Sequence, residues 1–191
     1  MNKIKLLTAI SELSLFIGCT VKSDVDEEIP IVLVNLSVDE IIAHKSCEGD
    51  GEDGEADIYT YIIIKANDSI GAPPNTVIET SEIEYELAKG ESVVPEIKAS
   101  AVIVPFHGMQ IQLIVKSKEV DPQNTHINET FYEVLVYDED LRCWIDWNGT
   151  ECKSGSNSGT SEMTKSLQSR MTTNNQVCDV SFKWSFDIQA Q

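Results

Sequence analysis

Hydrophobic and polar residues alternate with a period of two along most of this chain. The clearest case runs from Val180 to Ile188, where five apolar side chains alternate with polar ones, and the stretch from Met109 to Val115 behaves in the same way. Successive side chains of a strand point to opposite faces, so this pattern predicts strands with one buried face and one face toward water. Further strands are predicted at 31–38, 57–66, 77–87, 97–104 and 131–137, with a short one at 143–147.

Turn signals separate these segments. Segments that contain Gly, Pro, Asn, Asp or Ser stand at 67–69, 71–74, 89–91 and 121–122. Short strands with frequent turns predict an all-β fold, an antiparallel eight-stranded β-sandwich. The stretch 150–176 begins with a low-complexity segment, 153–160, and for the part that follows, 161–171, both a short helix and a strand are compatible with the sequence.

One predicted strand carries a row of glutamates. Glu82, Glu84 and Glu86 alternate with Ile83 and Tyr85. An acidic row opposite an apolar row is what a solvent-facing sheet surface requires, so we assign this row no chemistry.

The N-terminus has the pattern of an export signal. Lys3 and Lys5 precede a mostly apolar run, 6–17, that ends at Gly18-Cys19. This junction resembles the lipobox of bacterial lipoproteins, in which the Cys becomes the lipidated first residue. The alternative is a short buried helix with a core Cys.

The lipobox resemblance implies three segments. Residues 1–18 would be the signal peptide, 19–29 an acidic tether that begins at the lipidated Cys19, and 30–191 the β-sandwich domain. The acidic tether also resembles the surface-export signal of some Bacteroidetes lipoproteins. The expected location is therefore the cell envelope, at the outer membrane or cell surface, with the membrane reached through the lipid anchor.

The other cysteines agree with export. Their number is even, which in an oxidising compartment favours disulfides. Three pairings are possible, of which we prefer Cys143 with Cys152 and Cys47 with Cys178. A zinc site is the alternative, although no pair has the C-x2–4-C spacing that is common in such sites.

The charge is strongly negative. A net charge of −18 argues against nucleic acid as a partner, because phosphate backbones are bound chiefly by Lys and Arg. It is compatible with cation binding or simply with solubility.

Two acidic segments supply candidate cation ligands. Asp138, Asp140 and Asp146 follow a predicted strand with the spacing D-x-D-x5-D, and Asp50 and Asp57 belong to an upstream acidic stretch, 48–57. Calcium takes six to eight oxygen ligands and tolerates irregular geometry, so these carboxylates predict calcium. The pattern is not that of an EF-hand.

The downstream segment, VYDEDLRCWIDWNG, resembles the third calcium loop of the C2 domain family. The matching positions are Val136, Tyr137, Asp138, Asp140, Asp146, Trp147 and Gly149. The segment 54–60 is similar to the first loop of that family through Asp57 and Tyr59, and Asp50 stands near the place of the other first-loop Asp. The resemblance implies an eight-stranded sandwich that binds calcium at one end, often as a bridge to anionic phospholipid.

Two functions are compatible with these features. The first is a non-catalytic, calcium-binding lipoprotein that recognises a surface or partner, whether anionic lipid, glycan or protein. The second is a metal-free structural or interaction module, with carbohydrate binding as one form of it, in which the aspartates cap turns. We do not expect an enzyme, because no nucleophile motif accompanies His44, His107 or His126.

Overall fold

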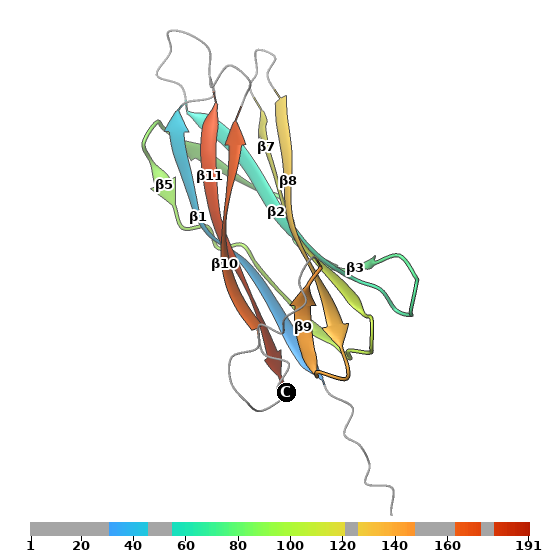
Figure 1. Ribbon diagram of the computed structural model, residues 1–191. Coiled ribbons are helices and arrows are strands. Elements are labelled where there is room, and N and C mark those ends of the chain that lie inside the picture. Colours follow the sequence, from blue (N-terminus) through green and yellow to red (C-terminus); the bar gives the residue numbers. More distant parts are fainter. Residues whose placement is uncertain (1–30, 46–54, 121–125, 148–162, 173–177) are drawn as a thin grey trace, which may run out of the picture.

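Two antiparallel sheets packed face to face make up the structure (Figure 1). A computed structural model describes residues 31–45, 55–120, 126–147, 163–172 and 178–191, which contain eleven strands. The predicted fold class, an all-β antiparallel sandwich, is confirmed. The described residues contain no helix that is long and apolar enough to cross a membrane.

Sheet A is organised around the first and last strands of the chain. Its order is β10-β11-β1, and both β5 and β6 pair with the edge of β1 that is opposite β11. The strands are β1 (Val32–Lys45), β5 (Ser92–Val93), β6 (Lys98–Ile103), β10 (Met163–Thr172) and β11 (Asp179–Ala190). Strand β10 lies in the stretch for which the sequence predicted no single element.

Sheet B has the order β3-β2-β7-β8-β9, and β4 also pairs with β2. The strands are β2 (Ala56–Ala66), β3 (Asn75–Glu79), β4 (Ile83–Leu87), β7 (Gln110–Val120), β8 (His126–Asp138) and β9 (Cys143–Asp146). The single strand predicted at 77–87 is therefore two strands, β3 and β4, which both pair with β2. Such interrupted edges raise the number of strands above eight without changing the architecture.

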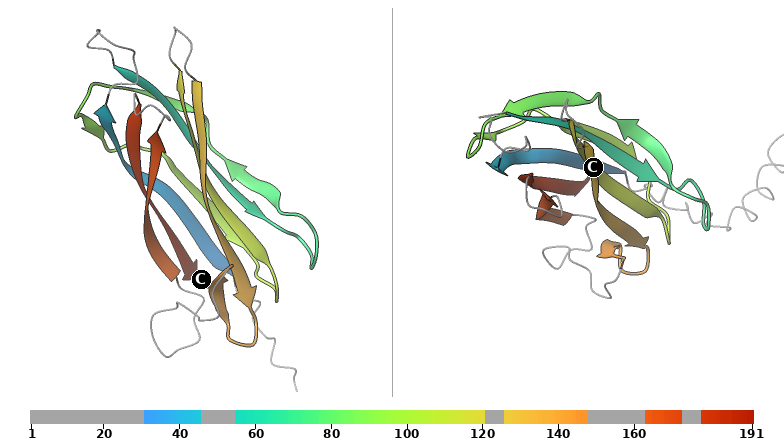
Figure 2. Two further views of the ribbon diagram at one scale, coloured as in Figure 1. Left: turned by 45° about the horizontal axis from the view of Figure 1, so that its top comes forward. Right: turned by 90° about the horizontal axis from the view of Figure 1, so that it is seen from above.

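The core fills the space between the two layers, which Figure 2 shows from two sides. Phe182, Trp184 and Phe186 point inward from β11, as their alternation predicted, and all three are buried. The ring of Phe131, from sheet B, lies 5.3 Å from that of Phe182 and so joins the layers. The Nε1 of Trp184 donates to Ser169 Oγ at 3.0 Å, which satisfies the polar atom of this buried ring.

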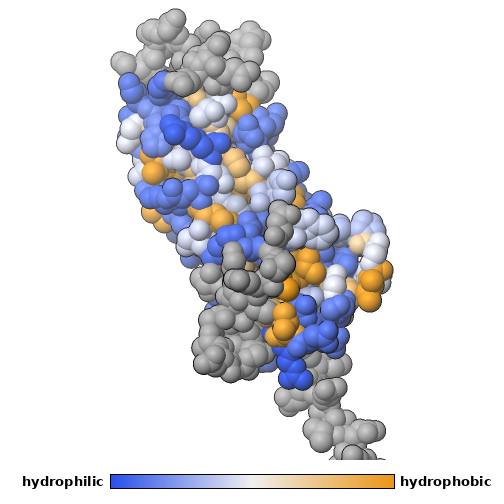
Figure 3. Space-filling model, viewed as in Figure 1, coloured by the Kyte–Doolittle hydropathy of each residue, from blue (hydrophilic) through white to orange (hydrophobic). Residues whose placement is uncertain are grey.

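Sheet A presents a hydrophilic outer face, visible in the upper part of Figure 3. Arg170 Nε donates to Asp179 Oδ1 at 2.6 Å, and Lys183 pairs with Glu40. The hydrogen bond from Arg170, helped by its charge and opposed by burial, lowers the pKa of the Asp179 carboxyl. The polar groups of this face therefore find partners within the sheet.

Two of the predicted disulfide cysteines lie within the described residues. Cys143 and Cys178 are both buried and are each disulfide-bonded. Cys143 begins β9 and Cys178 precedes β11, at opposite ends of the sandwich in Figure 1. Cys47 and Cys152 lie outside the described residues, so the pairing remains a prediction.

Strand direction fixes the two ends of the sandwich. Strand β2 is antiparallel to β7 and β7 is antiparallel to β8, so β2 and β8 run in the same direction. Both descend in Figure 1, from an upper end that also holds the end of β1 to a lower end that also holds its start. The C-terminus of the chain lies at the lower end.

Truncating the central aromatic of β11 tests this packing. We expect Phe182→Ala to lower the free energy of unfolding by about 3–5 kcal/mol, because it leaves a cavity between the sheets. The neighbouring Lys183→Gln, on the outer face, should cost less than about 1 kcal/mol. Urea unfolding measures both, and equal effects would contradict the assignment of inner and outer faces.

Candidate metal site on the outer face of sheet B

Asp138 has a structural role in the hairpin that joins β8 to β9. Its Oδ1 accepts a hydrogen bond from the backbone N of Leu141 at 3.0 Å, which caps the turn. Arg142 closes the same turn in a left-handed conformation, with φ of 51°, and its N donates to Glu139 O at 3.2 Å. Asp140 is exposed within the turn.

Asp146 lies on the other face of sheet B from Asp138. It pairs with Leu135, whereas Asp138 stands three positions further along β8, and an odd separation puts two side chains on opposite faces. The Nζ of Lys165, from β10 of sheet A, contacts Glu133 and lies 3.6 Å from Asp146 Oδ1. Asp146 thus belongs to an ion-pair group that bridges the two sheets.

The first acidic segment ends at the opposite end of the molecule. Asp57 is the second residue of β2, at the upper end, while Asp138 ends β8 at the lower end. The length of β8 separates these ends by roughly 40 Å. The expected calcium site, built from Asp57, Asp138, Asp140 and Asp146 at one end of the sandwich, is therefore not formed, and Asp50 lies outside the described residues.

A different acidic group forms at the upper end. Within the described residues, one group of three metal-ligating side chains is found, in which oxygen atoms of Asp57, Glu84 and Glu86 lie within 4.8 Å of one another. Asp57 pairs directly with Glu86, and Tyr59 pairs with Glu84, so the three side chains share the outer face of β2 and β4. We call this group the acidic triad.

Sequence reasoning found Asp57 but missed its partners. The predicted row of glutamates was correctly placed on a solvent-facing surface, and two of its three members, Glu84 and Glu86, are exposed members of the triad. Nothing local in the sequence indicates that β4 pairs with the beginning of β2 and so brings these glutamates to Asp57. To find the triad from the sequence, one would have needed to know the register in which β4 pairs with β2.

Tyr59 and Lys118 shape the electrostatics beside the triad. The Tyr59 hydroxyl donates to Glu84 Oε1. This hydrogen bond, followed by partial burial and the charges of Glu84, Asp57 and Glu82, raises the pKa of Tyr59 to about 12. Lys118 Nζ lies 2.9 Å from Glu82 and 5.0 Å from the centre of the Tyr59 ring. The ion pair of this lysine is therefore with Glu82, which stands outside the triad.

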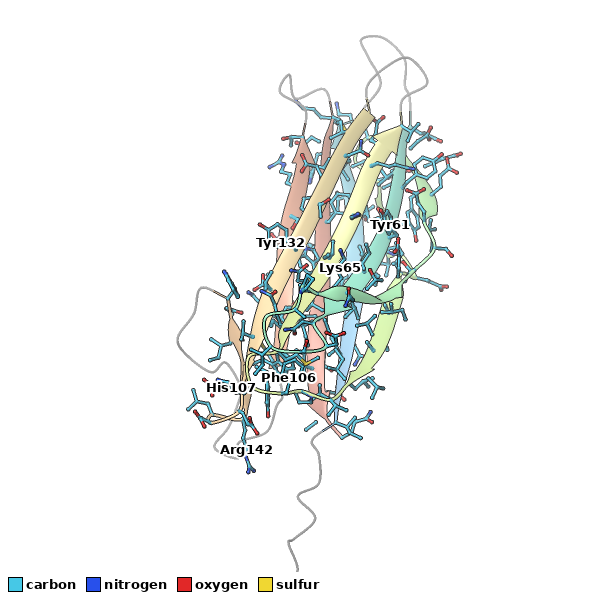
Figure 4. The ribbon with its side chains drawn as sticks, turned by 90° about the vertical axis from the view of Figure 1, so that its right-hand side faces the viewer. Tyr61, Lys65, Phe106, His107, Tyr132 and Arg142 are labelled. Carbon is cyan, nitrogen blue, oxygen red and sulfur yellow. The ribbon has the colours of Figure 1, made fainter. Side chains whose placement is uncertain are left out.

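Trp144 and the histidines His107 and His44 are held by packing or hydrogen bonds. Trp144 is 1% exposed and packs on Tyr137, whereas Trp147 is 60% exposed. His107 Nδ1 accepts a hydrogen bond from Glu139 N at 3.3 Å, and Figure 4 shows His107 at the lower end near Arg142. His44 Nε2 lies 2.6 Å from Ser181 Oγ.

Comparisons with known proteins add little to this geometry. No protein-family model matches the chain, and no curated protein matches it. Among solved structures, the chain is similar to a C2 domain of a plant extended synaptotagmin. The two are 8% identical with a TM-score of 0.33, over 85% of this chain and 95% of that one. A likeness this weak carries no argument, so membership of the C2 family remains a prediction.

The raised pKa of Tyr59 is directly testable. Its hydroxyl stays protonated to higher pH in the folded chain than in the unfolded one, so its contribution to stability is present below about pH 10 and is lost as pH rises toward 12. We expect Glu84→Gln to bring the Tyr59 pKa back toward 10, because a neutral amide replaces the charged carboxylate that accepts the hydrogen bond of the hydroxyl.

Carbon-13 NMR of labelled tyrosine measures this titration. Glu79→Gln is the matched control, since Glu79 lies on β3 and does not contribute to the pKa shift of Tyr59. An unchanged Tyr59 pKa in Glu84→Gln would show that the hydrogen bond is absent in solution.

Proposed function

We propose that the chain is an exported, lipid-anchored β-sandwich that binds calcium through the acidic triad and recognises a surface or partner without catalysing a reaction. The observation that carries this proposal is the approach of three carboxylate groups within 4.8 Å. Like charges at this separation repel one another, and the attraction of each carboxylate to a bound cation offsets this repulsion.

The chemistry of the triad suits calcium. Three carboxylates supply between three and six oxygen atoms, depending on whether each binds through one oxygen or two, and water completes the shell of a cation that takes six to eight. Magnesium requires stricter octahedral geometry, which exposed strand side chains are poorly placed to impose. Because two members of the triad are exposed, we expect a weak site, with a dissociation constant of roughly 10⁻⁴–10⁻³ M, as in other extracellular calcium modules.

The proposed anchor sets the orientation of the domain. Lipidation of Cys19 would attach the chain to a membrane of the cell envelope, through the segment 20–30, which extends over at most roughly 40 Å. The described domain begins at the lower end with β1, whereas the triad lies at the upper end. The calcium site would therefore face away from the anchoring membrane, toward an external surface or partner.

A metal-free interaction module is the alternative. It is favoured by the hydrogen bond from Tyr59 to Glu84 and the ion pair of Lys118 with Glu82, which give the acidic edge strand partners without any cation. In this alternative, the triad is an ordinary solvated surface.

Calcium titration during thermal unfolding separates these functions. Binding to the native state alone raises the melting temperature with calcium concentration. We expect a rise of a few degrees at ten to a hundred times the dissociation constant, corresponding to about 1.4–2.7 kcal/mol. The triple variant Asp57→Asn, Glu84→Gln, Glu86→Gln should abolish this rise.

The double variant Asp138→Asn, Asp140→Asn is the control at the other end of the sandwich, and it should retain the full calcium response. A response lost in the double variant and kept in the triple variant would move the site to the lower end. If calcium does not raise the melting temperature of the parent protein, the calcium proposal is wrong and the metal-free alternative stands.

The anchor is tested separately from calcium. In the bacterial host, we expect the Cys19→Ser variant to lose the lipid and to move from the membrane fraction to the soluble fraction of the envelope, because a lipid chain supplies its affinity for the bilayer. Mass spectrometry of the mature N-terminus measures the modification. An unmodified Cys19 in the parent protein would contradict the anchor while leaving the calcium proposal intact.

A further inference from the structure

The middle of sheet B carries an unusual combination of side chains on its outer face. Strand register places Tyr61 beside Lys116, and in the next outward row Ile63, Ile114 and Tyr132 stand side by side across β2, β7 and β8. Lys65 lies one outward row further along β2. Figure 4 looks onto this face and labels Tyr61, Lys65 and Tyr132 on it, with Lys65 below the two tyrosines. We call Tyr61, Lys65, Lys116 and Tyr132, with the two isoleucines, the tyrosine face.

The centre of the tyrosine face is buried although it is on the outer side of sheet B. Ile63 is only 4% exposed and Ile114 only 7%, whereas the adjacent Tyr132 is 68% exposed. Long lysine and tyrosine side chains in general lay their stems and rings over apolar neighbours and keep their polar tips in water. An exposed aromatic ring beside a covered apolar strip offers a flat surface for a ligand.

The tyrosine face is basic in a strongly acidic protein. Neither Lys65 nor Lys116 has a carboxylate partner among the described residues, although the chain has a net charge of −18. The Nζ of Lys116 lies 5.6 Å from the centre of the Tyr61 ring. Two of the described acidic residues stand at the margin of this face: Glu79 on β3 pairs with Ile63, and Glu84 on β4 pairs with Tyr59, one outward row from Tyr61. Lys65 and Lys116 therefore favour an anionic ligand over the middle of this face, with Glu79 and Glu84 at its edge.

The spacing of the lysines and tyrosines indicates the shape of the ligand. Lys65 and Lys116 lie on neighbouring strands and are offset by four residues, which separates their Cα atoms by roughly 14 Å. The Cα atoms of Tyr61 and Tyr132, two strands and two residues apart, are separated by roughly 12 Å. A single phosphate or carboxylate group is too small to span this arrangement, whereas an extended chain with repeated charges and repeated flat rings matches it.

We propose that the tyrosine face binds an acidic oligosaccharide, a chain of sugar rings that carries carboxylate or sulfate groups. The C–H faces of its sugar rings pack on the tyrosines, and its anionic groups pair with Lys65 and Lys116. Gln112, directly opposite Lys65 on β7, supplies an amide for sugar hydroxyls. This interaction uses none of the triad carboxylates and requires no calcium.

Isothermal titration calorimetry of the folded domain with a galacturonate hexasaccharide tests this proposal, with EDTA present to remove calcium. We expect binding that weakens as salt is added, and no binding of the neutral maltohexaose. Tyr132→Ala, and separately the double variant Lys65→Gln, Lys116→Gln, should each weaken binding at least about tenfold, the size of a lost stacking or charge contact. The charge-matched control Lys89→Gln, Lys98→Gln, which changes exposed lysines away from this face, should bind as the parent does.

Thermal unfolding of each variant shows whether it is folded, and the three altered side chains lie on the outer face, where substitution leaves the core intact. Absence of binding to the hexasaccharide would overturn the proposal, and so would binding that both variants retain. Equal binding of the neutral sugar would show that the lysines do not contribute to binding, and it would overturn the proposal that the ligand is acidic. Binding to phosphatidylserine vesicles in place of the sugar, with the same dependence on the lysines, would identify a lipid surface and would equally overturn it.

Discussion

The direction of the strands in sheet B is the constraint on which the arrangement of acidic residues depends. An antiparallel strand carries the chain from one end of a sandwich to the other, and β2 and β8 descend in the same direction. Residues at the beginning of β2 and residues at the end of β8 therefore lie at opposite ends. No adjustment of loop conformation brings Asp57 to Asp138 while these ladders remain intact.

Period-two alternation then decides which carboxylates meet. Asp57 shares the outer face of sheet B with Glu84 and Glu86 because β2 and β4 pair in register, whereas Asp138 and Asp146 fall on opposite faces of the same sheet. Sheet B also carries the tyrosine face, while sheet A uses its outer positions for hydroxyls and ion pairs. The two surfaces proposed to bind ligands are therefore found on one layer of the sandwich.

The sequence predicted the elements of this fold better than their associations. The alternation from Val180 to Ile188 identified β11 and its inward aromatics, because a strand that is buried on one face has apolar residues at every second position. The D-x-D-x5-D motif suggested a shared site, yet a four-residue turn between Asp138 and Cys143 makes it a hairpin whose aspartates have separate roles. The triad was missed because it depends on the pairing of β2 with β4, and the sequence of neither segment alone predicts that pairing.

The central claim is that a cation binds at the upper end of the sandwich, at the acidic triad. Paramagnetic NMR locates it most directly, with a trivalent lanthanide such as gadolinium in place of calcium, because relaxation falls off steeply with distance from the ion. We predict that amide signals of β2 and β4 around Asp57, Glu84 and Glu86 broaden first and that those of the β8–β9 hairpin remain sharp. Selective broadening around Asp138 and Asp140, with β4 unaffected, would contradict the account.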